Sequence, residues 1–150
     1  MPNWCSNEVQ IDGNEKDIAK FKEECFTDHK GVAVLDFSKV LPEPDYDKPK
    51  KDGTHNDGVQ TEFSSVMPDW WNWRNDNWGT KWNLVPNPDG GLTMYDEVQS
   101  DDTYIQLEFE TAWSPPNGIY EAIVEKYPDL DINWFYREDG VQISGWLPYE

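Results

Sequence analysis

The sequence predicts one α+β domain with a ferredoxin-like, split βαβ fold, in which an antiparallel sheet carries two helices on one face. Within residues 103–113, apolar side chains alternate with polar ones, most regularly over 105–110, which is typical of a half-buried strand. Two segments with apolar residues at helical spacing each follow a predicted strand. The order strand-helix-strand, insertion, strand-helix-strand-strand matches two βαβ units. A chain of 150 residues is long enough to bury one core.

The first βαβ unit is predicted at the N-terminus. Residues 4–11 alternate as a strand does and end at Asp12-Gly13. The inner side of this strand consists of Cys5, Asn7, Val9 and Ile11. Asn14 is a suitable N-cap for the next helix. The apolar stripe of that helix consists of Ile18, Phe21, Cys25 and Phe26. Residues 32–37 are mostly apolar and predict the second strand.

The middle of the chain combines a polar insertion with a tryptophan-rich segment. Residues 42–60 are dominated by Pro, Asp, Lys and Gly, which predicts a long mobile loop. Residues 67–82 hold five of the nine tryptophans, and a short helix is expected to begin near Pro68 and to end before Gly79. Residues 81–85 and 92–98 are expected to be strands, with a turn between them at 86–91.

The second βαβ unit follows. In the strand over residues 103–113, the predicted inner side chains are Ile105, Leu107, Phe109, Thr111 and Trp113. The outer ones are Tyr104, Gln106, Glu108 and Glu110. Ser114-Pro115-Pro116 is expected to cap a helix whose apolar positions are Ile119, Ile123 and Tyr127. Residues 131–138 and 141–147 predict a hairpin, with Glu138 and Arg137 as an exposed pair at its turn.

The charge of the chain restricts its partners. Thirty acidic residues against twelve basic ones leave a net charge of −18. Binding to a phosphate backbone requires Lys and Arg, so direct nucleic-acid binding is not expected, and an anionic membrane surface is disfavoured for the same reason. A protein with a basic surface is the partner that this charge favours.

The charge is uneven along the chain, because no Lys or Arg occurs between Lys81 and Lys126 while several acidic residues do. Glu108 and Glu110 share one face of a predicted strand, and Asp101 and Asp102 precede it. Such a row of carboxylates on a rigid sheet is able to imitate DNA phosphates. A solvated surface that keeps the protein soluble explains the same residues. Both interpretations stay open at this stage.

The tryptophans also allow two interpretations. Trp70, Trp71 and Trp73 lie beside the polar insertion and are candidate anchors for a partner. A second candidate site is a ligand pocket for a nucleotide or another planar anion, which would be lined by Trp78, Lys81, Trp82 and Trp113. The structural alternative is that the three tryptophans of this second site, Trp78, Trp82 and Trp113, pack against the sheet as core.

Catalysis and metal binding have little support in the sequence. There is neither GxSxG nor a Gly-rich phosphate loop, so no catalytic residue is assigned and no enzyme activity or cofactor is expected. His29 and His55 have no second ligand at suitable spacing, so no metal site is predicted. Cys5 and Cys25 are expected to be reduced core thiols. Without a signal peptide or a long apolar run, a soluble cytoplasmic protein is expected.

Three motifs resemble the YubB-type ferredoxin-like family of bacteriophages and mobile plasmids. They are Met1-Pro2-Asn3-Trp4-Cys5-Ser6-Asn7, Trp78-Gly79-Thr80-Lys81-Trp82 and Thr111-Ala112-Trp113-Ser114-Pro115-Pro116. The resemblance implies a ferredoxin-like fold without an iron–sulfur cluster, in an accessory protein of a mobile element. It implies no established activity and no catalytic residues.

Two functional hypotheses follow. In the first, a phage or plasmid protein in the host cytoplasm binds a host protein with a basic surface and inhibits a nucleic-acid-binding or defence factor. In this hypothesis Asp101, Asp102, Glu108 and Glu110 steer the partner electrostatically, and the three tryptophans Trp70, Trp71 and Trp73 anchor it. In the second, the protein is a small-ligand module that uses the Trp-lined pocket. The oligomeric state and the host target stay open.

Overall fold

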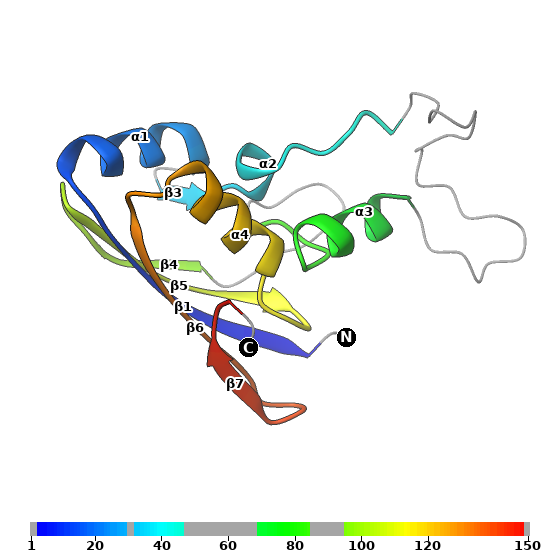
Figure 1. Ribbon diagram of the computed structural model, residues 1–150. Coiled ribbons are helices and arrows are strands. Elements are labelled where there is room, and N and C mark those ends of the chain that lie inside the picture. The colour runs from blue at the N-terminus through cyan, green and yellow to red at the C-terminus, as the bar shows by residue number, and fades with distance from the viewer. Residues whose placement is uncertain (1–2, 30–31, 47–68, 85–94, 149–150) are drawn as a thin grey trace, which may run out of the picture.

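A computed structural model describes residues 3–29, 32–46, 69–84 and 95–148. A five-stranded antiparallel sheet in the order β4-β5-β1-β6-β7 is covered by helices on one face only (Figure 1). A separate two-stranded sheet pairs β2 with β3. The strands are β1 (Trp4–Asp12), β2 (Phe26–His29), β3 (Val32–Leu35), β4 (Tyr95–Ser100), β5 (Tyr104–Ala112), β6 (Asp131–Glu138) and β7 (Ile143–Trp146). The helices are α1 (Glu15–Cys25), α2 (Phe37–Val40), α3 (Asp69–Asn77) and α4 (Asn117–Lys126).

The main sheet contains two interlocking split βαβ units, and the ferredoxin-like prediction is confirmed. The first unit runs from β1 through α1 to β4, and β5 lies between its two strands. The second unit runs from β5 through α4 to β6, and β1 lies between its two strands. β7 then extends the sheet beyond β6 as an edge strand.

The second strand of the first unit was assigned to the wrong segment. Residues 32–37 were expected to enter the main sheet, but β3 pairs with β2 in a hairpin that joins Phe26 to Leu35. Phe26 therefore begins β2 instead of continuing the stripe of α1, and Phe37 begins α2. β4 takes the expected position in the main sheet, because a short apolar run does not specify which strand it pairs with.

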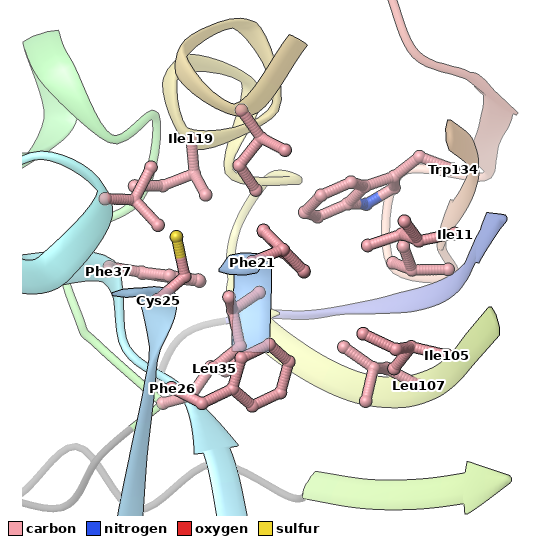
Figure 2. Close-up of a cluster of buried hydrophobic side chains, with 14 of the residues drawn as sticks. Ile11, Phe21, Cys25, Phe26, Leu35, Phe37, Ile105, Leu107, Ile119 and Trp134 are labelled. Carbon is pink, nitrogen blue, oxygen red and sulfur yellow. The ribbon is translucent and has the colours of Figure 1, made fainter. Parts of the chain in front are cut away.

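Alternate side chains of β1 and β5 are buried in the core, as predicted. Cys5, Asn7, Val9 and Ile11 are buried, as are Ile105, Leu107, Phe109 and Thr111. Figure 2 shows sheet residues such as Ile11 and Trp134 directed toward Phe21 of α1 and Ile119 of α4. The predicted cap of α1 is also present, because the Asn14 side chain accepts a hydrogen bond from the Asp17 N–H.

Asn7 is a buried polar side chain that ties three strands together. Its Nδ2 donates to Thr111 Oγ1 of β5 at 3.0 Å and to the Cys5 carbonyl at 3.1 Å. Its Oδ1 accepts from Trp134 Nε1 of β6 at 2.9 Å. Because Asn7 is 1% exposed and Trp134 is fully buried, water cannot replace these bonds.

Asp36 plays the corresponding role between the β2–β3 hairpin and α2. Its Oδ1 accepts from Ser38 N, Ser38 Oγ and Asn83 Nδ2, and its Oδ2 accepts from Thr27 Oγ1. Burial by itself would raise the pKa of this carboxyl, but the hydrogen bonds from Ser38, Asn83 and Thr27 outweigh it and lower the pKa. The charged form of Asp36 is therefore stabilised by folding.

Replacing Asp36 by asparagine is expected to give an acid-sensitive loss of stability. A carboxyl whose folded pKa is lowered contributes stability above its ordinary value of 3.8 and loses it as the pH falls through the folded pKa. At pH 7 we expect D36N to lower the free energy of unfolding by about 1–2 kcal/mol. Urea unfolding of both proteins between pH 7 and pH 2 measures the difference, which should shrink as the pH falls. A difference that is independent of pH would contradict this role.

The structure corrects two predictions at the end of β5. Trp113 was expected to face the core, but β5 ends at Ala112 and Trp113 is 52% exposed. Its φ of 71° turns the chain out of the strand, so the alternation stops one residue early. Ser114 was expected to cap α4, but its Oγ donates to the Gly79 carbonyl at 2.6 Å. Pro116 is the N-cap of α4 and makes no side-chain cap bond.

Glu138 is buried, and its prediction as an exposed partner of Arg137 was wrong. Its carboxylate accepts from the backbone N–H groups of Gly140 and Val141, both at 2.8 Å, and so closes the β6–β7 turn. Arg137 instead pairs with Asp139 at 3.0 Å. A carboxylate within reach of two turn N–H groups is held more firmly than one in a solvated ion pair.

Two further predictions concern the middle of the chain. The short helix that ends before Gly79 is confirmed as α3. The strand expected over residues 81–85 is wrong as far as the described residues extend, because residues 81–84 are not in a strand. Most of the 42–60 insertion, the turn at 86–91 and the beginning of the strand predicted at 92–98 lie outside the described residues.

Candidate functional site

The three sequence motifs that stand out in the chain meet at one end of the main sheet. The Trp113 N–H donates to the Asn3 carbonyl at 2.8 Å. The rings of Trp4 and Trp82 lie 5.8 Å apart, and Lys81 Nζ lies 4.4 Å from the centre of the Trp82 ring. Residues 3–7, 78–82 and 111–116 therefore form one junction, which joins β1 to the loop after α3 and to the end of β5.

Backbone contacts explain the glycine and the hydroxyl residues of this junction. Thr80 is 1% exposed, and its Oγ1 donates to the Ala112 carbonyl at 3.0 Å. Gly79 has a φ of 88°, a conformation that side chains disfavour. A Cβ on Gly79 would lie 2.7 Å from the Asn117 nitrogen. The motif residues are needed for this close approach of two backbones, and that is a structural role.

Gly118 of α4 makes the closest approach. Its N–H donates to the Trp78 carbonyl at 3.1 Å. A Cβ on Gly118 would lie 1.7 Å from the Asn77 carbonyl oxygen, which is far inside van der Waals contact. α4 therefore packs directly on the C-terminal end of α3 at a position where only glycine fits.

One of the residues predicted to line the Trp-lined pocket, Trp78, does not line a pocket. Trp78 is fully buried, its Nε1 donates to the Leu41 carbonyl at 2.9 Å, and its ring packs against Phe37 at 5.7 Å. It cannot contact a ligand in this conformation, so its assignment to the pocket was wrong and its assignment to the core is confirmed. Trp82 is half-buried and Trp113 is exposed, so neither of them is core.

The three candidate anchor tryptophans on α3 are all half-buried. Trp73 packs edge-on against Trp78 at 5.8 Å and belongs to the scaffold. The guanidinium of Arg74 lies 5.0 Å from the centre of the Trp70 ring and pairs with Glu43. None of the three tryptophans is a prominent exposed ring.

The four candidate acids do not form one cluster. Asp101 Oδ1 accepts from Thr103 N, Thr103 Oγ1 and Tyr104 N, so this carboxylate shapes the β4–β5 turn. The hydrogen bond from the Thr103 N–H is the main reason that the pKa of Asp101 is lowered. Asp102 is exposed at the same turn. Glu108 and Glu110 lie further along β5, about 20–30 Å from these two aspartates by strand rise.

The face of the main sheet opposite the helices is acidic. We call this the open face (Figure 1). Glu8 of β1 and Glu108 of β5 are directly paired in register, and both are exposed. Glu110 is paired with Ser6 on the same two strands. The described carboxylates at open-face positions of β1, β5 and β6 are Glu8, Asp12, Glu108, Glu110 and Asp131.

An aromatic pair lies on the open face beside these carboxylates. Trp146 of β7 is 61% exposed, and its ring centre lies 5.2 Å from that of Phe135 on β6. A cavity of about 150 Å³ adjoins the pair. Its lining includes Glu8, Gln10, Gln106, Asn133, Phe135 and Trp146. Sequence reasoning missed Trp146 and Glu8. The hairpin at Glu138-Asp139-Gly140 was visible, but only the register shows that Trp146 pairs with Phe135.

The two cysteines are not activated as nucleophiles. Cys5 and Cys25 are free and buried, as predicted. Burial is the main reason that the pKa of Cys5 rises to about 12 and that the pKa of Cys25 is raised, so both stay protonated. Within the described ranges, His, Cys, Asp and Glu side chains form no group of three that could hold a metal ion. No helix in the described part of the chain has the length and apolar character to cross a membrane.

Comparison with known proteins supports the fold in the second half of the chain. Residues 94–150 match the family model described as the ferredoxin-like domain in Api92-like protein. This segment contains β4, β5, α4, β6 and β7. No curated protein and no solved structure matches the chain.

Proposed function

We propose that this protein binds a host protein with a basic surface through its acidic open face and thereby inhibits a nucleic-acid-binding or defence factor. The protein acts without catalysis, in the cytoplasm of the host cell, as an accessory protein of a phage or plasmid. The observation that carries the proposal is the register of β1 and β5, which pairs Glu8 directly with Glu108 on the face opposite the described helices.

The pairing of Glu8 with Glu108 is unfavourable for the protein alone. Directly opposed residues on antiparallel strands have Cβ atoms about 4.5–5.5 Å apart, and like charges at that distance destabilise the sheet. A basic partner would relieve this repulsion. Arg137, a cationic side chain at an open-face position of β6, already pairs with Asp139. The face therefore presents an excess of negative charge to an incoming partner.

Strand geometry makes the carboxylates resemble a row of phosphates. Glu108 and Glu110 lie about 7 Å apart along β5, by strand rise. The rigid sheet holds such charges in place without further ordering, which favours competition with DNA for a basic groove. The resemblance of the N-terminal motif, residues 1–7, to phage and plasmid proteins supports this context.

Neutralising the open face is expected to slow association with the partner. The host protein would first be purified by pull-down, and its association rate then measured by surface plasmon resonance at low and high salt. For the triple variant E8Q/E108Q/E110Q we expect association to be about tenfold slower at low salt, and the rates should converge at high salt. Displacement of DNA from the same partner should weaken in parallel.

A matched control variant distinguishes an effect of the open face from an effect of the net charge of the protein. The triple variant E23Q/E121Q/E125Q changes the net charge equally but on exposed positions of α1 and α4. It should associate nearly as fast as the unmodified protein. Equal slowing by the two triple variants, or no slowing by the first, would overturn the assignment to the open face.

A further inference from the structure

We propose that the cavity beside Trp146 on the open face binds an arginine side chain of the basic partner. This inference rests on the proposed function and deepens it by naming the chemical group that is recognised. Such a subsite would give the open face specificity for one side chain, which negative charge by itself does not provide.

One row of side chains crosses four strands at this place. The register pairs Trp146 of β7 with Phe135 of β6, Phe135 with Glu8 of β1, and Glu8 with Glu108 of β5. Neighbours in such a row are about 4.5–5.5 Å apart at their Cβ atoms. An aromatic half of the row therefore adjoins a carboxylate half directly, and the cavity of about 150 Å³ lies along it.

The exposed position of Trp146 calls for an explanation. The Trp146 side chain is 61% exposed on an edge strand. Its ring packs against the Phe135 ring, and the two ring planes are tilted by 59°. Aromatic side chains are the residues that most often anchor protein interfaces, because they bury much area at little entropic cost. Here the ring is held by its neighbour and presents a free surface toward solvent.

Arginine matches the chemistry of this row better than other groups do. Its planar guanidinium stacks on aromatic rings and offers five N–H donors. With the guanidinium on the ring pair, Glu8 is within one strand spacing, and the lining amides of Gln10, Gln106 and Asn133 supply carbonyl acceptors. A lysine ammonium carries the same charge but lacks the planar surface. A nucleotide is disfavoured, because Glu8 and Glu108 would repel its phosphates.

The test compares labelled oligoarginine and oligolysine peptides of equal length by fluorescence anisotropy with the full chain. We expect tighter binding of oligoarginine by about fivefold, the range of a cation–π contact. In W146A this preference should disappear. In E8Q both peptides should bind more weakly. W113A is the matched control, because Trp113 is similarly exposed at 52% but lies outside the row, and it should keep the preference.

The outcomes separate the inference from the proposed function. Equal binding of the two peptides by the unmodified protein, or a preference that survives W146A, would overturn the arginine subsite and leave the basic-partner proposal standing. Failure of both peptides to bind would overturn both. If W146A does not fold, judged by its thermal unfolding, W146L keeps an apolar side chain without an aromatic face, and loss of the preference in W146L supports the subsite.

Discussion

Replacing Gly118 by alanine is expected to lower the free energy of unfolding by about 3 kcal/mol or more. The new Cβ would lie 1.7 Å from the Asn77 carbonyl oxygen and 3.3 Å from the Trp78 carbonyl carbon. These are backbone atoms at the end of α3, so they cannot move aside by a change of rotamer. α4 would have to separate from α3, which would break the Gly118–Trp78 hydrogen bond and loosen the core around Trp78.

Thermal and urea unfolding measure this effect, and the melting temperature of G118A should fall by about 10 °C or more. Gly145 on β7 is a suitable control position. A Cβ there would first meet Tyr136 Oη at 3.1 Å, which is the end of a side chain that is able to shift. G145A should change stability by less than about 1 kcal/mol. Equal stability of G118A and G145A would mean that the contact between α3 and α4 is not as close as the structure places it.

Replacing Asn7 by leucine is expected to cost about 3 kcal/mol. Leucine has a similar volume but cannot accept the hydrogen bond from Trp134 Nε1, which would then be buried without a partner. It also cannot donate to Thr111 Oγ1 or to the Cys5 carbonyl. Because Asn7 joins β5, β1 and β6, the loss should weaken the centre of the sheet and not only one edge.

Urea unfolding, with hydrogen exchange of the β1 and β6 amides, measures the loss in N7L. Asn133 on β6 provides the control, because it is exposed on the open face. Its replacement by leucine should change stability by no more than about 0.5 kcal/mol. If N7L is as stable as N133L, the buried network around Asn7 contributes nothing net.

Local patterns predicted the elements whose signals lie within a few residues. The alternation in β1 and β5, the Asn14 cap and the bounds of β6 are all present as expected. Strand pairing was harder, because it depends on contacts distant in sequence. The run over residues 32–37 looks like a sheet strand from its composition, and nothing local indicates that it pairs with β2.

The candidate site was predicted in part. Glu108 and Glu110 were placed on the outer side of their strand, and the structure exposes or half-exposes both. Their neighbour Glu8 lies on another predicted strand and was not identified as a candidate. Asp101 was counted among the steering acids, although three hydrogen bonds give it a role in the turn. The sequence does not indicate which backbone N–H groups will donate hydrogen bonds to a carboxylate such as that of Asp101.

The sequence by itself determined the fold class, the excess negative charge and the inner side chains of β1 and β5 as far as Thr111, because periodicity and composition are local properties. Only the tertiary structure decided which charges are neighbours and which aromatic rings reach the surface. Glu8 meets Glu108 across a distance of one hundred residues because of strand register, and Trp146 meets Phe135 for the same reason. A shift of one residue in either pairing would move these side chains to the opposite face.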